Sequence, residues 1–135
     1  MDWELQEQDE RIRDRELCDF VPERVFDAHL HLYAADHFDG AGPALTRSGP
    51  ATAGWEEYQS RIRQILPARE IRGLAFAYPA TNVRFDVANR FVSQQVQSVG
   101  ALGQMLVHPD MDLDFLRESV RSGGYRGLKP YHLFS

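Results

Sequence analysis

Polar and apolar residues alternate most clearly between Arg24 and Leu32, and this alternation predicts a β-strand. Successive side chains of a strand point to opposite faces of the sheet. One face of the predicted strand is wholly apolar, as expected if helices cover it, and consists of Phe26, Ala28, Leu30 and Leu32. The opposite face consists of Val25, Asp27, His29 and His31. The stretch therefore presents two histidines on the side of the strand that faces away from the predicted helices.

Three further apolar stretches predict strands, near residues 72–78, 102–107 and 126–131. Apolar residues spaced three and four apart predict helices between the strands instead. These helices are expected at residues 2–18, at 55–66, from Asn82 or Asp86 to about 99, and at 112–121. Helices and strands thus alternate along the whole chain.

Residues 33–54 hold several glycines and prolines and predict a long irregular connection. This connection leaves directly from the end of the histidine strand, so it is placed to act as a lid. Asp36 and His37 lie within it, and we expect both to be solvated loop residues.

Alternating helices and strands indicate a parallel sheet with right-handed crossovers, either an open sheet or a barrel. A nucleotide-binding open sheet should carry a glycine-rich turn after its first strand, where this chain carries histidines. Residues of the ligand type follow three strand ends instead: His29 and His31, then His108, then Lys129 and His132. A (β/α)8 TIM barrel places its active site at these ends. We therefore expect an α/β fold of the (β/α)8 type, with only the first four βα units present.

His29 and His31 are two residues apart, which points both rings the same way and about 6–7 Å apart along the strand. Neutral imidazoles at this spacing suit zinc and other borderline divalent metals. A chance pair, or histidines that are merely hydrogen-bonded in a core, is the alternative interpretation.

Composition narrows the class of protein. With 135 residues the chain forms one domain at most, with a helical leader at 1–24 and the main unit at 25–135. The net charge of -5 argues against binding to nucleic acid. Cys18 is the only cysteine, so neither an internal disulfide nor a cysteine-based zinc cluster is expected. No apolar run is long enough for a bilayer and the N-terminus is polar, so we expect a cytoplasmic protein.

The stretch 20–31, which ends in the His-x-His motif, resembles the entry into the first strand of the amidohydrolase superfamily. It is most similar to the amidohydrolase-related (amidohydrolase 2) branch of metal-dependent hydrolases and decarboxylases. The stretches 106–110 and 127–132 resemble the ends of that branch's third and fourth strands. The resemblance covers most of the chain from Phe20 onward and implies a distorted barrel with one or two divalent metals, usually zinc.

The resemblance also implies roles for individual residues. His29 and His31 match the first-strand metal ligands, and Lys129 matches a lysine that bridges two metals in some branches. We expect Lys129 and His108 to be catalytic, by binding a substrate carboxylate or stabilising negative charge, and His132 and Tyr131 to contact substrate. A surface cation and a core hydrogen bond are the alternatives for Lys129 and His108. The implied reaction is hydrolysis of a C–N or C–O bond in a small carbonyl substrate, or a related decarboxylation.

That family completes its site with histidines from strands five and six and an aspartate from strand eight, whereas this sequence stops at Ser135. We therefore expect a truncated half-barrel without significant hydrolase activity of its own. It would need the missing C-terminal half or a second copy of the chain. The alternative is a non-catalytic half-barrel that binds metal weakly or pairs with another chain.

Overall fold

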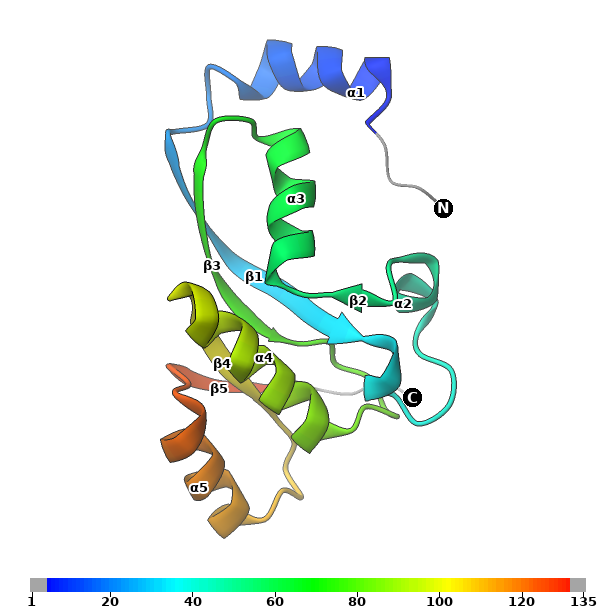
Figure 1. Ribbon diagram of the computed structural model, residues 1–135, viewed down its shortest axis with the longest axis vertical. Coiled ribbons are helices and arrows are strands. Elements are labelled where there is room, and N and C mark those ends of the chain that lie inside the picture. Colours follow the sequence, from blue (N-terminus) through cyan, green and yellow to red (C-terminus); the bar gives the residue numbers. More distant parts are fainter. Residues whose placement is uncertain (1–4, 132–135) are drawn as a thin grey trace.

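A single sheet of five strands runs through the molecule in the spatial order β2-β1-β3-β4-β5 (Figure 1). The computed structural model describes residues 5–131. The strands are β1 Arg24–Ala34, β2 Thr52–Ala53, β3 Glu70–Ala77, β4 Leu102–Val107 and β5 Gly127–Pro130. β1, β3, β4 and β5 pair in parallel, and β2 pairs antiparallel with β1. The four strands predicted from the sequence are confirmed.

Helical segments fill the connections between the strands. The short segments are α1 Glu7–Ile12, the π-helix η1 Arg13–Leu17, the 3-10 turn η2 Ala35–His37 and α2 Ala44–Ser48. The longer helices are α3 Trp55–Ile65, α4 Phe85–Val99 and α5 Leu113–Gly123. Glycines in the left-handed conformation, Gly100 and Gly124, follow the last residues of α4 and α5. The predicted helices in these three positions are confirmed.

The core lies between the sheet and α4, which packs against β1, β3 and β4. Figure 1 shows α3 and α4 against the same side of the sheet. Leu32, Ala75 and Ala77 from the strands and Val92 from α4 are fully buried or nearly so. A side chain of the size of Leu32 or Val92 contributes about 1.5–3 kcal/mol when it is withdrawn from water, and the alanines contribute less. This layer is what holds the ends of β1 and β3 together beneath the histidines.

The prediction of a (β/α)8-type half-barrel is wrong. Residues 33–54 turn back on β1, so that Tyr33 pairs with Ala53 and Ala34 with Thr52 in antiparallel register. The amide of Ala35 adds a 2.7 Å hydrogen bond to the carbonyl of Ala51. β2 therefore occupies the edge of β1 that a closed barrel would pair with its last strand. The result is an open, mixed, five-stranded sheet.

The leader runs across one end of the molecule, above α3 (Figure 1). Arg13 donates a 3.1 Å hydrogen bond to the carbonyl of Gln64 at the end of α3. Arg69, just before β3, donates to the carbonyls of Cys18 at 2.6 Å and Val21 at 3.2 Å. These bonds tie the leader to the amino-terminal ends of β1 and β3, remote from the ends that carry the histidines.

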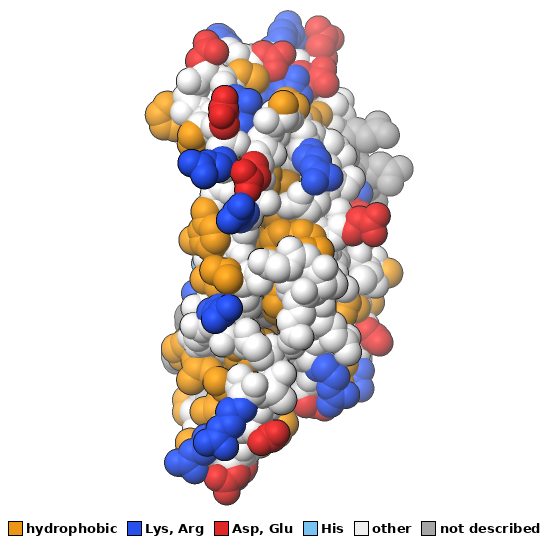
Figure 2. All heavy atoms as spheres, turned by 60° about the vertical axis from the view of Figure 1, so that its left-hand side comes forward, with side chains coloured by type: hydrophobic (Ala, Val, Ile, Leu, Met, Phe, Trp, Pro, Cys, Tyr) orange, Lys and Arg blue, Asp and Glu red, His pale blue; other side chains and the backbone are white. Residues whose placement is uncertain are grey.

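The surface mixes apolar and charged side chains. Figure 2 shows hydrophobic side chains along one side of the molecule, with acidic and basic side chains interspersed above and below them. Phe26, Leu102 and Leu128 are the large apolar strand residues with exposed side chains. Among residues 5–131, none of the helices has the length and apolar character that crossing a lipid bilayer requires.

Candidate metal centre

A β-bulge in β1 decides which way the histidines point. Asp27 is paired with Gly73, but Leu30 is already paired with Ala75, so three steps along β1 match two along β3. The alternation of more and less exposed side chains along β1 is interrupted at the same place, because the neighbouring residues Ala28 and His29 are both exposed. The extra residue turns the strand, as bulges do.

Asp27 consequently does not share a face with the histidines, and that expectation is wrong. Its side chain points to the helix side of the sheet, where one carboxylate oxygen, Oδ2, accepts a 3.0 Å hydrogen bond from the hydroxyl of Tyr58 in α3. The other oxygen, Oδ1, accepts a 3.0 Å hydrogen bond from the backbone amide of His29. Asp27 is therefore no candidate ligand beside His29 and His31, since its carboxylate is directed toward Tyr58 of α3.

His29 and His31 do lie together, on the face opposite α3 and α4. Their ring centroids are 5.1 Å apart with an interplanar angle of 79°. Both rings pack edge-on against the fully buried Phe76 of β3, at centroid distances of 4.8 and 4.5 Å. Phe76 is thus the apolar side chain against which both imidazoles pack.

The hydrogen bond of His31 defines its tautomer. Its Nδ1 lies 3.3 Å from the carbonyl oxygen of Ala77, and a carbonyl only accepts, so Nδ1 carries the proton. Nε2 is then left with its lone pair. Burial lowers the pKa of His31 from its ordinary value of 6.5; the bond to Ala77 opposes this effect, and the nearby His29 and Lys129 add to it. The ring is therefore held in the neutral form that can act as a ligand or base.

Lys129 and Tyr131 approach the pair from the far edge of the sheet. The Lys129 ammonium lies 4.8 Å from the centroid of the Phe76 ring and 5.6 Å from that of Tyr131. Tyr131 in turn lies 6.3 Å from the His31 ring. Cation–π contacts of this length hold the ammonium over the aromatic faces. One positive charge and a phenol ring thus stand beside the two imidazoles.

The separation of the two imidazoles suits two histidine ligands of one zinc ion. A Zn–N bond of about 2.0–2.1 Å at tetrahedral angles places two imidazole centroids roughly 5 Å apart; the observed 5.1 Å agrees with this value, and it is also an ordinary distance for two rings packed edge to face. The carbonyl of Ala77 behind His31 is the kind of outer partner that orients a metal-bound histidine. Within residues 5–131, however, no group of three or more His, Cys, Asp or Glu side chains could hold a metal.

The structure does not show every other predicted site residue beside His29 and His31. The His108 ring, at the end of β4, packs 4.7 Å from the ring of Phe85 at the start of α4. His132 lies outside the described residues. Lys129 and Tyr131 are therefore the additional predicted residues that the structure shows beside the pair.

His37 is a buried residue, and the expectation that it would be solvated is wrong. Its side chain is 3% exposed, its Nδ1 accepts a 3.1 Å hydrogen bond from the amide of Ala34, and its ring packs on Phe91. Burial lowers its pKa from 6.5, an effect that Asp36 opposes and Arg84 reinforces. His37 fastens the end of β1 to α4; its neighbourhood of glycines and polar residues hid this from sequence reasoning.

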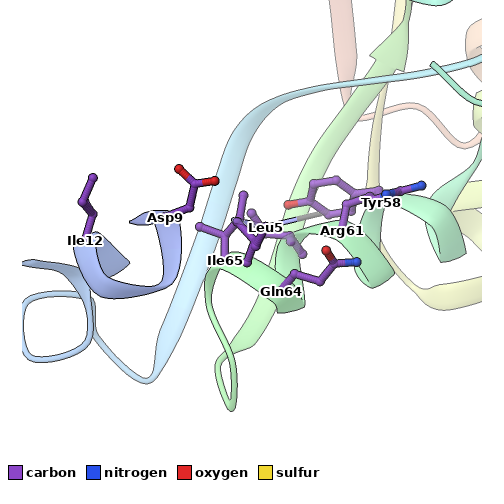
Figure 3. Close-up of a pocket in the computed structure, with 8 residues that line it drawn as sticks. Leu5, Asp9, Ile12, Tyr58, Arg61, Gln64 and Ile65 are labelled. Carbon is purple, nitrogen blue, oxygen red and sulfur yellow. The ribbon is translucent and has the colours of Figure 1, made fainter. Parts of the chain in front are cut away.

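A separate pocket of about 470 Å³ lies between the leader and α3 (Figure 3). Its walls are mainly apolar, with Leu5, Ile12 and Ile65 among the lining residues and Asp9 and Arg61 as charged members. Its lining includes one carboxylate, from Asp9, and neither a histidine nor a cysteine, which does not suit metal binding.

No protein-family model matches this chain, and no curated protein or solved structure is significantly similar to it. The candidate centre is therefore assigned from its own residues. These are the paired imidazoles of His29 and His31, the carbonyl of Ala77 behind them, and the ammonium of Lys129 beside them.

Proposed function

We propose that this chain carries the histidine pair of a metal-dependent hydrolase of the amidohydrolase-related type, with zinc as the metal. The observation that carries the proposal is the pairing of the His29 and His31 rings at 5.1 Å, with Nδ1 of His31 turned toward the carbonyl of Ala77. The substrate is a small carbonyl compound whose C–N or C–O bond is hydrolysed, or a carboxylic acid that is decarboxylated. The resemblance adds to the proposal through its motif residues alone, because the barrel that it implies is not the fold of this chain.

Each nearby residue has a part in the proposed chemistry. His29 and His31 would hold the metal, which when bound supplies Lewis acidity toward a substrate carbonyl. The ammonium of Lys129 is placed to pair with a substrate carboxylate or to stabilise developing negative charge. Tyr131 is proposed to contact an apolar part of the substrate, and the fully buried Phe76 supports the two imidazoles and the ammonium from beneath. His108 stays a proposed catalytic residue through the resemblance alone; its ring packs on Phe85.

Two imidazoles are fewer than the three protein ligands of a typical catalytic zinc site. We therefore propose that the remaining ligands come from outside the described residues, from a second copy of the chain or from another segment. The location proposed for the protein is the cytoplasm. What supports this is that the sequence contains one cysteine, Cys18, and so cannot form the internal disulfides that are common in small secreted domains.

A second candidate function is a non-catalytic domain that binds metal and pairs with another chain. The exposure of His29, and of the apolar Phe26 on the same strand, favours it. This function predicts zinc binding without turnover, and a mass in solution above that of one chain.

One experiment separates the two candidates. The purified chain is titrated with zinc by calorimetry and then assayed against lactone, amide and aromatic carboxylate substrates, beside the double variant His29→Ala, His31→Ala. Gln94→Ala, an exposed position on α4, is the matched control. If a second copy of the chain supplies the remaining ligands, the hydrolase proposal expects zinc-dependent turnover that the double variant loses and the control keeps. Zinc binding without turnover would favour the second function, and unchanged zinc binding in the double variant would refute both.

A further inference from the structure

The bulge in β1 interrupts its backbone pairing with β3, so the bulged residues need other hydrogen-bond partners. A bulged residue is left out of the ladder of backbone hydrogen bonds. Here the amide of His29 bonds instead to the Oδ1 atom of Asp27, two residues before it. The backbone that carries the first imidazole is thus held by a side chain.

That side chain is itself held from the helix layer. Tyr58 on α3 donates its hydroxyl proton to the Oδ2 atom of Asp27 at 3.0 Å, and both residues are half-buried. A charged acceptor makes such a hydrogen bond stronger than a neutral one. A continuous chain of two hydrogen bonds therefore runs from α3, through the sheet, to the backbone of His29.

The two histidines differ in how they are supported. The His31 ring is bonded directly to the carbonyl of Ala77 and lies in the regular part of the strand, where His31 pairs with Phe76. His29 is exposed, and its position depends on the bulge. The distance and angle between the two rings therefore depend on how the backbone of His29 is held.

From these observations we infer that Asp27 and Tyr58 are positioning residues, which fix the backbone of His29 and so the approach of its imidazole to that of His31. The effect on a metal rests on the function proposed above; the effect on His29 does not. A role in stability alone is the competing interpretation, because any half-buried hydrogen bond contributes to stability.

The variants separate these interpretations. Asp27→Ala removes both acceptors. Asp27→Asn keeps an acceptor for the His29 amide, and its NH₂ group can donate to the Tyr58 hydroxyl, which rotates to accept. Tyr58→Phe removes only the outer bond. Gln59→Leu is the matched control, because Gln59 is the next residue on α3 and donates a 3.2 Å hydrogen bond to the carbonyl of Ile71, away from the bulge.

Two readouts are measured on the ¹⁵N-labelled full chain: exchange of the His29 backbone amide without metal, and the zinc dissociation constant. We expect Asp27→Ala to speed His29 exchange and to weaken zinc binding about tenfold, the scale seen when outer partners of metal ligands are removed. Asp27→Asn should restore both toward the parent values, and Tyr58→Phe should give a smaller change in the same direction. Gln59→Leu should lower the melting temperature without changing either readout.

Unchanged His29 exchange in Asp27→Ala would overturn the inference, and so would an equal loss of zinc affinity in Gln59→Leu. If Asp27→Ala does not fold, Asp27→Asn and Tyr58→Phe still decide the question, since the inference requires Tyr58→Phe to speed His29 exchange more than Gln59→Leu does. If the parent chain does not bind zinc, the proposed function fails, whereas the exchange of the His29 amide still confirms or overturns the positioning role.

Discussion

The side chain of Asn89 in α4 makes two hydrogen bonds to the backbone of Leu106 in β4, one from its amide nitrogen to the carbonyl and one from the Leu106 amide to its oxygen, each 2.8 Å long. β3 and β4 are paired only at Leu74–Leu102 and Ala75–Gly103. Beyond this point Asn89 bonds the backbone of Leu106 on the helix side, while β5 continues to pair with β4. The Asn89 side chain, which is 3% exposed, thus joins α4 to the sheet through hydrogen bonds to a strand backbone.

Asn89→Ala is predicted to destabilise the protein by about 2–4 kcal/mol, because each buried backbone group left unpaired costs about 1–3 kcal/mol. Urea denaturation measures the effect, with Gln94→Ala on the exposed face of α4 as control. A cost no larger than that of the control would show that water or β3 can take the place of Asn89.

Gly73 lies opposite Asp27, where β3 meets the bulge. A Cβ atom here would lie 2.4 Å from the side chain of Leu30 and 3.3 Å from the carbonyl oxygen of Asp27. Leu30 is 4% exposed and has little room to move. Gly73→Ala is therefore predicted to cost about 1–3 kcal/mol, the usual range for overpacking, and to disturb the His29 amide signal. Thermal denaturation and an amide spectrum check both parts; a variant as stable as the parent would mean that the bulge adjusts freely.

Acidification is predicted to destabilise the protein through His37. Burial lowers the pKa of this ring in the folded state, so below about pH 6.5 the unfolded chain binds more protons than the folded one. Protonation would also place an N–H group against the amide of Ala34, which now donates to Nδ1. The stabilising contribution is thus present above pH 6.5 and is lost as the pH falls through the folded pKa.

His37→Asn tests this prediction, because the amide oxygen of Asn can accept the Ala34 bond without titrating. We expect the loss of unfolding free energy between about pH 7 and pH 5 to be smaller in His37→Asn than in the parent. Some pH dependence should remain, since the pKa of His31 is lowered as well. Phe91→Leu, which removes the ring contact and no titratable group, should keep the parent's pH dependence. Equal slopes in His37→Asn and the parent would contradict the assignment.

Local patterns in the sequence carried enough information for most elements of the fold. The alternation around His29 and His31 predicted β1, and the spacing of Val92 and Val96 predicted α4; both are confirmed. Glycine after a helix is a strong local signal, and Gly100 does end α4 in the left-handed conformation. These features depend on neighbours in the chain, which is why the sequence alone reveals them.

Features that depend on distant partners were missed. The strand β2 has two residues, Thr52 and Ala53, and exists only because the chain folds back on β1. The bulge is visible only in the register against β3, so strict alternation placed Asp27 on the wrong face. The half-barrel followed from counting parallel strands, and nothing local in the sequence indicated an antiparallel partner for the end of β1.

The central claim is that His29 and His31 together hold a divalent metal, and side-chain NMR tests it most directly. Correlation of the ring nitrogens with the ring protons, recorded as zinc is added to ¹⁵N-labelled protein, reports the tautomer and the coordination of each histidine. We predict that the signals of His29 and His31 change together, that Nδ1 of His31 stays protonated toward Ala77, and that its Nε2 shows the shift of metal binding. Unchanged signals from both rings at saturating zinc, or a change confined to His108 and His37, would contradict the account.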